Sequence, residues 1–311
     1  MSNFLSDNVR LCATIVSDTH IDEKHPVRIV PMYFLIRALS ASKKIGCDAF
    51  ITVGDTTSRG SRKNWDMTRD CFKKLSDAAD NIILTIGNHD GWNDDGYDAA
   101  IKEYYSAYSD ICKRAIDKPY FTTVIKGYHF ICLGTDSDSG CEAAISGEQI
   151  EWFKNEMQRA GETGKPIFVF CHQSLNQRHG LPRTWDRNED PNRPLDEGGI
   201  GARSDEVAKI LKTYKNVFYF SGHSHMGLCG EDMKTSEGYA SFEEEDGVTL
   251  VNLPSLSCGN HHGEMQNLGM GLQLEIYDNK VILRPKSYIS GHFITKLNIK
   301  DKKPYYEKEL V

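Results

Sequence analysis

Five short apolar stretches of the sequence each run directly into side chains that bind metal ions or exchange protons. These side chains are Asp18 and His20, then Asp55, then Asn88, His89 and Asp90, then His172, and finally His223 and His225. Carboxylate, imidazole and amide groups are hard-to-borderline ligands for metal ions. Continuous apolar stretches are typical of buried strands in a parallel sheet, and ligands bind beyond the carboxyl ends of such strands. The pattern therefore predicts metal chemistry at the ends of these five strands.

The spacing within two of the motifs supports this interpretation. Asp18 and His20 are two residues apart, and so are His223 and His225. On an extended chain, side chains two residues apart point to the same side. Each pair could therefore close on one metal ion or on two adjacent ions.

The elements that position these residues alternate between strands and helices. Strands are predicted at residues 11–17, 48–53, 82–86, 120–126, 128–135, 166–171, 216–220, 248–253, 271–277 and 281–285. Helices are predicted at 31–44, around 65–79, at 98–112, and after Ser146 and Ser204, because apolar residues recur there at helical spacing. The acidic stretch 243–246 is expected to be a solvated turn. Alternating strands and helices indicate an α/β fold.

Several local residues are assigned structural roles. Ser146 is expected to cap a helix, with Gln149 completing a capping box, and Ser204 is expected to cap the next helix. Gly87 is expected to let the chain turn sharply after its strand. Asp90 is expected to complete that turn rather than to orient a neighbouring side chain.

Composition limits the function classes. The 311 residues carry a net charge of −7, which does not favour a general nucleic-acid or membrane-surface binder. The nine cysteines contain no CxxC pair, and the first ten residues lack the features of a signal peptide. No apolar stretch approaches the length of a membrane span. We therefore expect a soluble, cytoplasmic protein with free thiols, and one domain over residues 1–311 with an irregular insertion at about 173–202 and a strand-rich C-terminal part.

The ordered motifs D-x-H, G-D, G-N-H-D, a single H and G-H-x-H resemble those of the calcineurin-like metallophosphoesterase superfamily. The resemblance covers residues 18 to 225 and implies a four-layer α/β/β/α sandwich with a dinuclear metal centre. It implies one metal ion bound by Asp18, His20, Asp55 and His225, and a second bound by Asp55, Asn88, His172 and His223. Asp55 would then bridge the two ions.

This ligand set suits hydrolysis of a phosphoester. A bridging carboxylate holds two cations roughly 3.5–4 Å apart, a spacing suited to in-line displacement at phosphorus. The pair lowers the pKa of a shared water, so a metal-activated hydroxide is available near neutral pH. Histidine-rich ligands favour Mn, Fe or Zn, as divalent or trivalent ions, over Mg. By the resemblance, His89 is not a ligand and faces the leaving-group oxygen as a general acid.

Arg59 is the second candidate catalytic residue. Protein serine/threonine phosphatases of this superfamily read G-D-x-x-D-R-G where this chain has residues 54–60, and their arginine contacts phosphate. Arg59 matches the pattern, but Ser58 replaces the aspartate that supports the catalytic histidine in those enzymes. Arg59 is therefore either a phosphate contact or a solvated loop residue. Purple acid phosphatases need a tyrosine soon after Asp55, and the chain has none there.

We therefore expect a dinuclear metal-dependent phosphohydrolase acting on a small-molecule phosphoester, with a diester favoured over a monoester. A phosphomonoesterase, including a protein phosphatase, and a non-catalytic metal-binding scaffold of the same fold are the alternatives. A metallo-β-lactamase needs H-x-H-x-D-H, and Met226 and Gly227 follow His225 here. The insertion, with Trp185, could shape the pocket because it directly follows His172. His261 and His262 are expected to lie in a surface loop.

Overall fold

The computed structural model describes residues 8–24, 27, 29–138, 140–176, 178, 198–225, 241–258, 268–290 and 305–311. All nine predicted site residues fall within these ranges. Most of the 173–202 insertion lies outside the described residues, and so do Trp185, His261 and His262.

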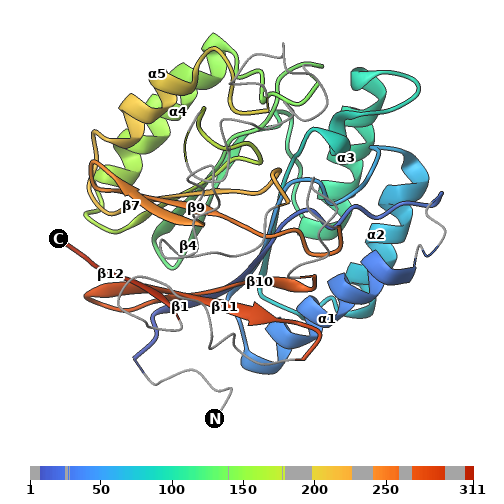
Figure 1. Ribbon diagram of the computed structural model, residues 1–311, viewed down its shortest axis with the longest axis horizontal. Coiled ribbons are helices and arrows are strands. Elements are labelled where there is room, and N and C mark those ends of the chain that lie inside the picture. The colour runs from blue at the N-terminus through green and yellow to red at the C-terminus, as the bar shows by residue number, and fades with distance from the viewer. Residues whose placement is uncertain are drawn as a thin grey trace, which may run out of the picture.

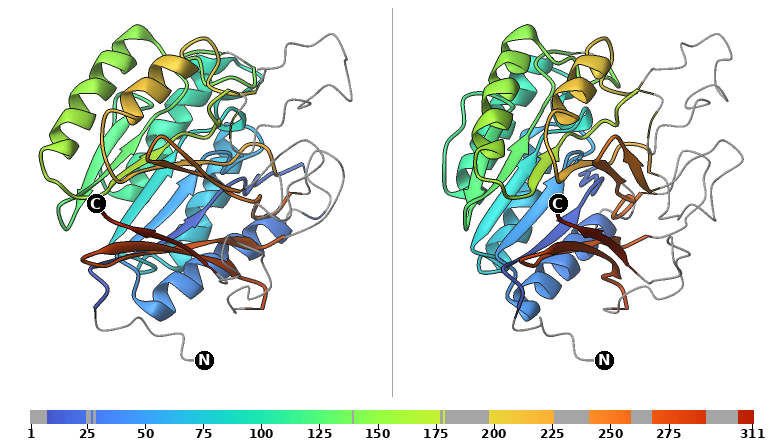
Figure 2. Two further views of the ribbon diagram at one scale, coloured as in Figure 1. Left: turned by 60° about the vertical axis from the view of Figure 1, so that its left-hand side comes forward. Right: turned by 90° about the vertical axis from the view of Figure 1, so that its left-hand side faces the viewer.

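The described strands form two six-stranded sheets (Figures 1 and 2). The first sheet has the order β12-β11-β10-β1-β2-β3. Its strands are β1 (Leu11–Val16), β2 (Ala49–Val53), β3 (Asn81–Thr85), β10 (Met270–Ile276), β11 (Lys280–Ser287) and β12 (Tyr306–Glu309). Strands β1, β2 and β3 are parallel, with Ile51 of β2 opposite both Ile15 and Ile83, and β10 extends the sheet in the antiparallel direction.

The second sheet has the order β4-β5-β6-β7-β9-β8. Its strands are β4 (Phe121–Ile125), β5 (Tyr128–Cys132), β6 (Ile167–Phe170), β7 (Val217–Ser221), β8 (Phe242–Glu245) and β9 (Val248–Asn252). The four central strands β5, β6, β7 and β9 are parallel, and each edge strand is antiparallel to its neighbour. The carboxyl ends of β6 and β7 therefore lie at one edge of this sheet.

Helices cover the outer faces of the two sheets. The helices α1 (Ile29–Ile45), α2 (Arg62–Lys74) and α3 (Tyr97–Cys112) lie on the side of the first sheet, and α4 (Gly147–Gly161) and α5 (Ser204–Leu211) lie on the side of the second (Figures 1 and 2). A 3₁₀ turn, η1 (His89–Gly91), follows β3. The predicted four-layer α/β/β/α arrangement is confirmed.

Alternating side chains on β6 explain why two sheets pack together. Phe168 and Phe170 belong to the core between the sheets, whereas Val169 belongs to the core beneath α4 and α5. The inward phenylalanines stack on those of β7, with ring centroids 5.4 Å apart for Phe168 and Phe218 and 4.9 Å for Phe170 and Phe220. Each such aromatic pair contributes about 0.5–1.5 kcal/mol beyond its buried area.

The predicted helix caps are only partly correct. Ser146 is the N-cap of α4, and its hydroxyl accepts from the Gln149 backbone N–H. The Gln149 side chain does not close a capping box, because it bonds Gly134 and Asp136 instead. The predicted Ser204 cap is wrong. Ser204 is the first residue of α5, and its hydroxyl accepts the backbone N–H of Asn176.

The acidic stretch 243–246 is not the solvated turn that was expected. Glu243 to Glu245 belong to edge strand β8, and only Asp246 enters the turn before β9, with φ +50°. Glu245 accepts from Arg178 and Lys212, so cross-element ion pairs neutralise part of this charge. The local composition of this stretch did not indicate a strand, because the residues that stabilise it are distant in the sequence.

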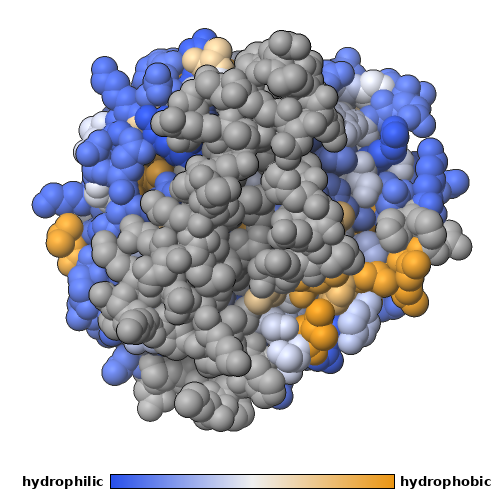
Figure 3. Space-filling model, viewed as in Figure 1, coloured by the Kyte–Doolittle hydropathy of each residue, from blue (hydrophilic) through white to orange (hydrophobic). Residues whose placement is uncertain are grey.

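A few apolar side chains remain exposed on the surface. On the face in Figure 3, hydrophobic residues gather at the lower right, where Figure 1 shows α1. Ile29 and Tyr33 of α1 are among the exposed large apolar residues. In the part of the chain that the structure describes, no helix is both long enough and apolar enough to cross a bilayer.

Candidate metal centre

The two sheets contribute different ligands to one site. Asp18, Asp55 and Asn88 follow β1, β2 and β3 of the first sheet. His172, His223 and His225 follow β6 and β7 of the second sheet, and His20 lies two residues beyond Asp18. Backbone hydrogen bonds join these segments: the His20 N–H donates to Asp55 O at 3.0 Å, and the Gly222 N–H donates to His172 O at 2.9 Å. The site therefore lies where the strand ends of both sheets meet.

The candidate ligands form two groups that share one carboxylate. Asp18, His20, Asp55 and His225 form the first group, and Asp55, His172 and His223 form the second. Within each group all ligand atoms lie within 4.8 Å of one another, and Asp55 belongs to both. Because the groups have separate histidines and one common carboxylate, the arrangement suits two adjacent cations.

The backbone at the ligands is not extended, so the reason given for their convergence is wrong. Five ligands have left-handed backbone angles, with φ of 53° at Asp18, 50° at His20, 46° at Asp55, 68° at His223 and 51° at His225. Non-glycine residues rarely adopt this conformation, and such strain clusters at functional sites. These turns, rather than strand alternation, bring the side chains together.

Three glycines of the motifs allow the chain to pass close to ligands of other motifs. A Cβ on Gly54 would lie 2.4 Å from His172 Nδ1, and one on Gly222 would lie 2.4 Å from Asp18 Oδ2. A Cβ on Gly87 would lie 2.2 Å from Asp55 Oδ1. Gly87 is therefore needed for this close approach and not for the sharp turn that was expected. It does not have a positive φ.

We expect Gly87→Ala to lower metal binding sharply, because its methyl group must push Asp55 out of place. Overpacking of this kind typically costs about 1–3 kcal/mol. Metal content by elemental analysis and melting temperature would measure both effects. Gly91→Ala is the matched control, since its Cβ would meet nothing closer than 3.4 Å. Equal metal content in the two variants would contradict the prediction.

Without metal, two ion pairs balance the charge of the cluster. His172 Nε2 lies 3.0 Å from Asp55 Oδ2, and His225 Nε2 lies 3.0 Å from Asp18 Oδ1. Burial opposes the charge on His172, but Asp55 and Asp18 outweigh it and raise the pKa of His172 to about 9. Burial lowers the pKa of His20 to about 4, so this ring stays neutral near pH 7.

The metal-free protein is expected to lose stability as pH rises from about 6.5 to 9. The folded-state pKa of His172 is raised from 6.5, so its contribution is complete below pH 6.5 and is lost as pH rises through about 9. A shift of this size corresponds to roughly 3 kcal/mol. Burial and the charge of Asp55 raise the pKa of Asp90 from 3.8 to about 7. The stability that protonated Asp90 contributes is therefore also lost as pH rises, but over this lower range.

Urea unfolding in a chelating buffer at several pH values would test this dependence. The slope between pH 6.5 and 9 should be weaker in metal-free His172→Asn and in the metal-loaded parent. A free energy of unfolding that stays level across this range in the metal-free parent would contradict the prediction.

The site contains lone pairs and buried acceptor oxygens that metal ions could satisfy. His172 Nδ1 lies 2.7 Å from Val53 O and must donate to it, which leaves a lone pair on Nε2 for a metal. Asn88 is 3% exposed, and its buried Oδ1 has no hydrogen-bond partner among the described residues. Asp55 Oδ2 is likewise buried without a hydrogen bond from the part of the chain that the structure describes, and in the metal-free protein the ion pair with His172 balances its charge. Buried acceptors of this kind are costly unless a cation satisfies them.

His89 is held beside the cluster without belonging to either ligand group. Its Nδ1 donates to the Ser58 backbone carbonyl at 2.9 Å, and its own backbone N–H donates to Asp55 Oδ1 at 2.9 Å. In protein phosphatases an aspartate at this position supports the catalytic histidine. Here Ser58 replaces it, and the Ser58 backbone carbonyl accepts the hydrogen bond from His89 instead. Because Nδ1 is occupied, proton transfer by His89 must use Nε2.

Asp90 has a larger structural role than its place in the motif indicates. Its carboxylate is fully buried and accepts hydrogen bonds from the backbone N–H groups of Thr56, Thr57 and Gly87, and from the Thr57 hydroxyl. The expectation that Asp90 only turns the chain is therefore wrong. It joins the loops after β2 and β3, which carry Asp55 and Asn88. The only available signal was its place in the G-N-H-D motif.

The candidate Arg59 lies in an ion pair, and so does Arg178 at the start of the insertion. Arg59 Nη1 lies 2.9 Å from Asp94 Oδ1, and the arginine side chain is 51% exposed. Arg178, in the insertion, donates to Glu245 Oε2 at 2.8 Å.

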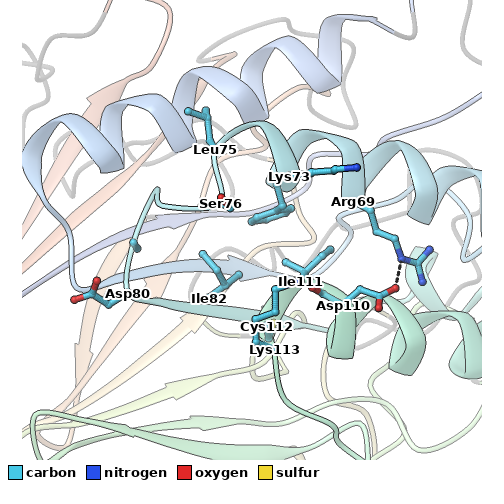
Figure 4. Close-up of a pocket in the computed structure, with 12 residues that line it drawn as sticks. Arg69, Lys73, Leu75, Ser76, Asp80, Ile82, Asp110, Ile111, Cys112 and Lys113 are labelled. Carbon is cyan, nitrogen blue, oxygen red and sulfur yellow. Dashed lines mark hydrogen bonds and ion pairs between the residues drawn. The ribbon is translucent and has the colours of Figure 1, made fainter.

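A cavity of about 450 Å³ lies apart from the Asp/His cluster. Figure 4 shows it between the C-terminal ends of α2 and α3, with Ile82 of β3 at its floor. Arg69 and Asp110 form an ion pair of 2.7 Å at its rim. None of the residues that line this cavity is a candidate metal ligand. The cavity is therefore not the catalytic site, although it is large.

The family comparison agrees with the fold and with the donor set. The family model for calcineurin-like phosphoesterases matches residues 13–227, which include all seven ligands that the sequence motifs supply. The chain belongs to this family, and it is a metal-dependent phosphoester hydrolase. No curated protein matches the sequence.

Solved structures share the fold at low sequence identity. A dimetal phosphatase from Danio rerio is similar, with a TM-score of 0.60, 11% identity, and coverage of 90% of this chain and 97% of that one. Purple acid phosphatase PPD1 from yellow lupin (Lupinus luteus) gives a TM-score of 0.62 at 12% identity over 91% of this chain. This chain spans about half of the lupin protein, 52% of its length.

Proposed function

We propose that the chain is a dinuclear phosphohydrolase whose two metal ions share Asp55, and that its substrate is a small-molecule phosphodiester. The sharing of the fully buried Asp55 by two otherwise separate ligand groups carries this proposal. Asp18, His20 and His225 would complete one site, and Asn88, His172 and His223 the other. Mn, Fe or Zn suits this mixed imidazole and carboxylate set better than Mg.

The residues of the chain then have distinct tasks. When bound, two metal ions supply Lewis-acid charge and lower the pKa of an attacking water. His89, oriented through the Ser58 carbonyl, presents Nε2 to the leaving-group oxygen and donates a proton or hydrogen bond there. Asp90 holds the loops of Asp55 and Asn88 in register through its four hydrogen bonds.

Charge near the site favours a diester. A monoester carries about two negative charges near neutral pH, because its second pKa is about 6. It therefore benefits from cationic groups in addition to metals. Arg59 is the only cation that the motifs place there, and Asp94 already pairs with it. The small cavity beside Arg59 is lined by three acidic residues, Asp22, Glu23 and Asp94, against one further cation, Lys24.

A phosphomonoesterase is the second candidate, and the exposed position of Arg59 supports it. Surface ion pairs contribute only about 0–1 kcal/mol, so Arg59 could leave Asp94 to contact a phosphate at little cost. In this alternative, Arg59 becomes a catalytic residue, as its position in the motif suggests.

Turnover of matched esters would test the proposed function. The metal-free protein would be reloaded with Mn, Fe or Zn, and bis-aryl diesters would be compared with the corresponding aryl monoesters. We expect two metal ions per chain and a higher kcat/KM for the diester. Rapid monoester turnover with inert diesters would favour the second candidate.

The 173–202 insertion is proposed to select the substrate. Its two ends are held together at its base, because Asn176 and Gly201 are joined by two hydrogen bonds of 3.0 Å. Replacing residues 179–197 with a Gly-Ser bridge should therefore be tolerated. We expect a higher KM for the best diester and nearly unchanged hydrolysis of a small aryl ester. Identical kinetics in parent and shortened protein would show that the insertion is not the selector.

Cytoplasmic location and a single domain over residues 1–311 stay predictions. The eight cysteines among the described residues are free thiols, as the sequence predicted for that part of the chain.

A further inference from the structure

A third group of ligand atoms lies at the centre. Cys258 joins His20 and His225, and the thiol sulfur and the ring nitrogens all lie within 4.8 Å of one another. None of the five motifs includes this cysteine, which follows β9 by six residues. Its side chain approaches the same two histidines that complete the site around Asp18.

Hydrogen bonds to the Asp18 turn position this thiol. Ser255 Oγ donates to Asp18 O at 2.9 Å, and the Leu256 N–H donates to Ser17 O at 2.9 Å. The Cys258 N–H in turn donates to Ser255 Oγ at 2.8 Å. The segment that carries the thiol is thus tied to the ligand-bearing turn after β1, so the approach is built into the fold.

The neighbouring charges show that a cation fits there. Asp55 Oδ2 is buried without a hydrogen bond from the described residues and lies 3.6 Å from His20 Nε2. In a tetrahedral site, Zn–S and Zn–N bonds of about 2.3 and 2.1 Å place the two ligand atoms about 3.6 Å apart. Donors that lie within 4.8 Å of one another therefore need to approach by no more than about 1.2 Å to reach that spacing.

We propose that Cys258 is a thiolate ligand of the metal ion held by Asp18, His20 and His225, and that it makes this site selective for zinc or iron. The inference rests on the proposed dinuclear centre. On coordination the S–H bond breaks, the proton passes to solvent and the sulfur lone pair binds the metal. A thiolate is a soft ligand and discriminates against Mn, which prefers oxygen donors.

The thiol keeps its proton until a metal arrives. Burial and the charges of Asp18 and Asp55 raise the pKa of Cys258 to about 12 in the metal-free chain. Metal loading should protect the thiol from alkylation, because the metal then occupies the sulfur lone pair. In the metal-free protein the raised pKa and the partial burial slow alkylation, so the comparison is made at alkaline pH, where more of the thiol is ionised.

Cobalt(II) provides a readout that does not depend on activity. The metal-free full-length protein would be loaded with cobalt, and the near-ultraviolet absorption would be recorded for sulfur-to-cobalt charge transfer. We expect this band in the parent and in Cys112→Ser, a control at the end of α3, and its loss in Cys258→Ser. Cys258→Ser should also weaken zinc binding at least about tenfold, near the lower end of losses seen around metals, with a smaller effect on manganese.

Alkylation of the parent provides a second test that needs no variant. Peptide mapping after prolonged iodoacetamide treatment at alkaline pH should show Cys258 modified in the metal-free protein and protected after zinc loading. A parent without the charge-transfer band, a band that persists in Cys258→Ser, or alkylation of Cys258 in the metal-free protein that zinc does not slow would overturn the proposal. A parent that shows the band but hydrolyses no phosphoester would refute the proposed function and leave the ligand assignment standing.

Discussion

Replacing Asp55 with asparagine is expected to remove most of the bound metal and to lower kcat/KM by at least about 10³-fold. Asp55 is the only residue that belongs to both principal ligand groups, and its carboxylate is fully buried. Lewis-acid assistance is worth several kcal/mol, and each step of about 1.36 kcal/mol changes a rate tenfold. Asparagine keeps the size of the side chain but removes the negative charge that two adjacent cations need.

Elemental analysis and steady-state kinetics on the same preparations would measure this loss. Asp48→Asn is the matched control, because Asp48 precedes the same strand β2 at its other end. Its carboxylate accepts the Cys12 N–H and pairs with Lys126, away from the ligands. A parent protein that holds no metal after loading, or an Asp55→Asn variant that keeps both metal ions and its rate, would refute the bridging role.

Replacing His89 with asparagine is expected to leave the metal content unchanged and to lower the rate by roughly 10²–10⁴-fold, the usual contribution of general acid catalysis. His89 belongs to neither ligand group, and its Nδ1 is used in the bond to the Ser58 carbonyl. The group that acts on substrate must therefore be Nε2. Asparagine cannot deliver a proton from that position.

The leaving group distinguishes proton donation from simple positioning. Alkyl alcohols need a proton as they leave, whereas nitrophenolate does not, so the loss should be larger for alkyl esters. His129→Asn is the control, because His129 lies on β5 outside the site. Equal losses for alkyl and nitrophenyl esters, or a fall in metal content, would contradict the assignment of His89 to the leaving group.

Local patterns in the sequence determined the type and order of most elements, although β8 and β12 were not predicted. A buried parallel strand needs a continuous apolar stretch, so β1, β2, β3, β6 and β7 could be recognised from composition alone. The residue types at their ends indicated a metal site, and the order of the motifs resembled that of metal-dependent phosphoesterases. The N-cap of α4 at Ser146 was also readable, since a cap bonds within its own first turn.

The tertiary structure decided how these local pieces act together. Asp55 and His172 are 117 residues apart in the sequence and lie on different sheets, yet they approach within 3.0 Å. The left-handed ligand residues, the glycine contacts and the carboxylate of Asp90 all depend on neighbours from other loops. Cys258 reaches the site only because its segment bonds the turn after β1. Such contacts leave no periodic signal, because their energy comes from packing and charge between segments that only the fold brings together.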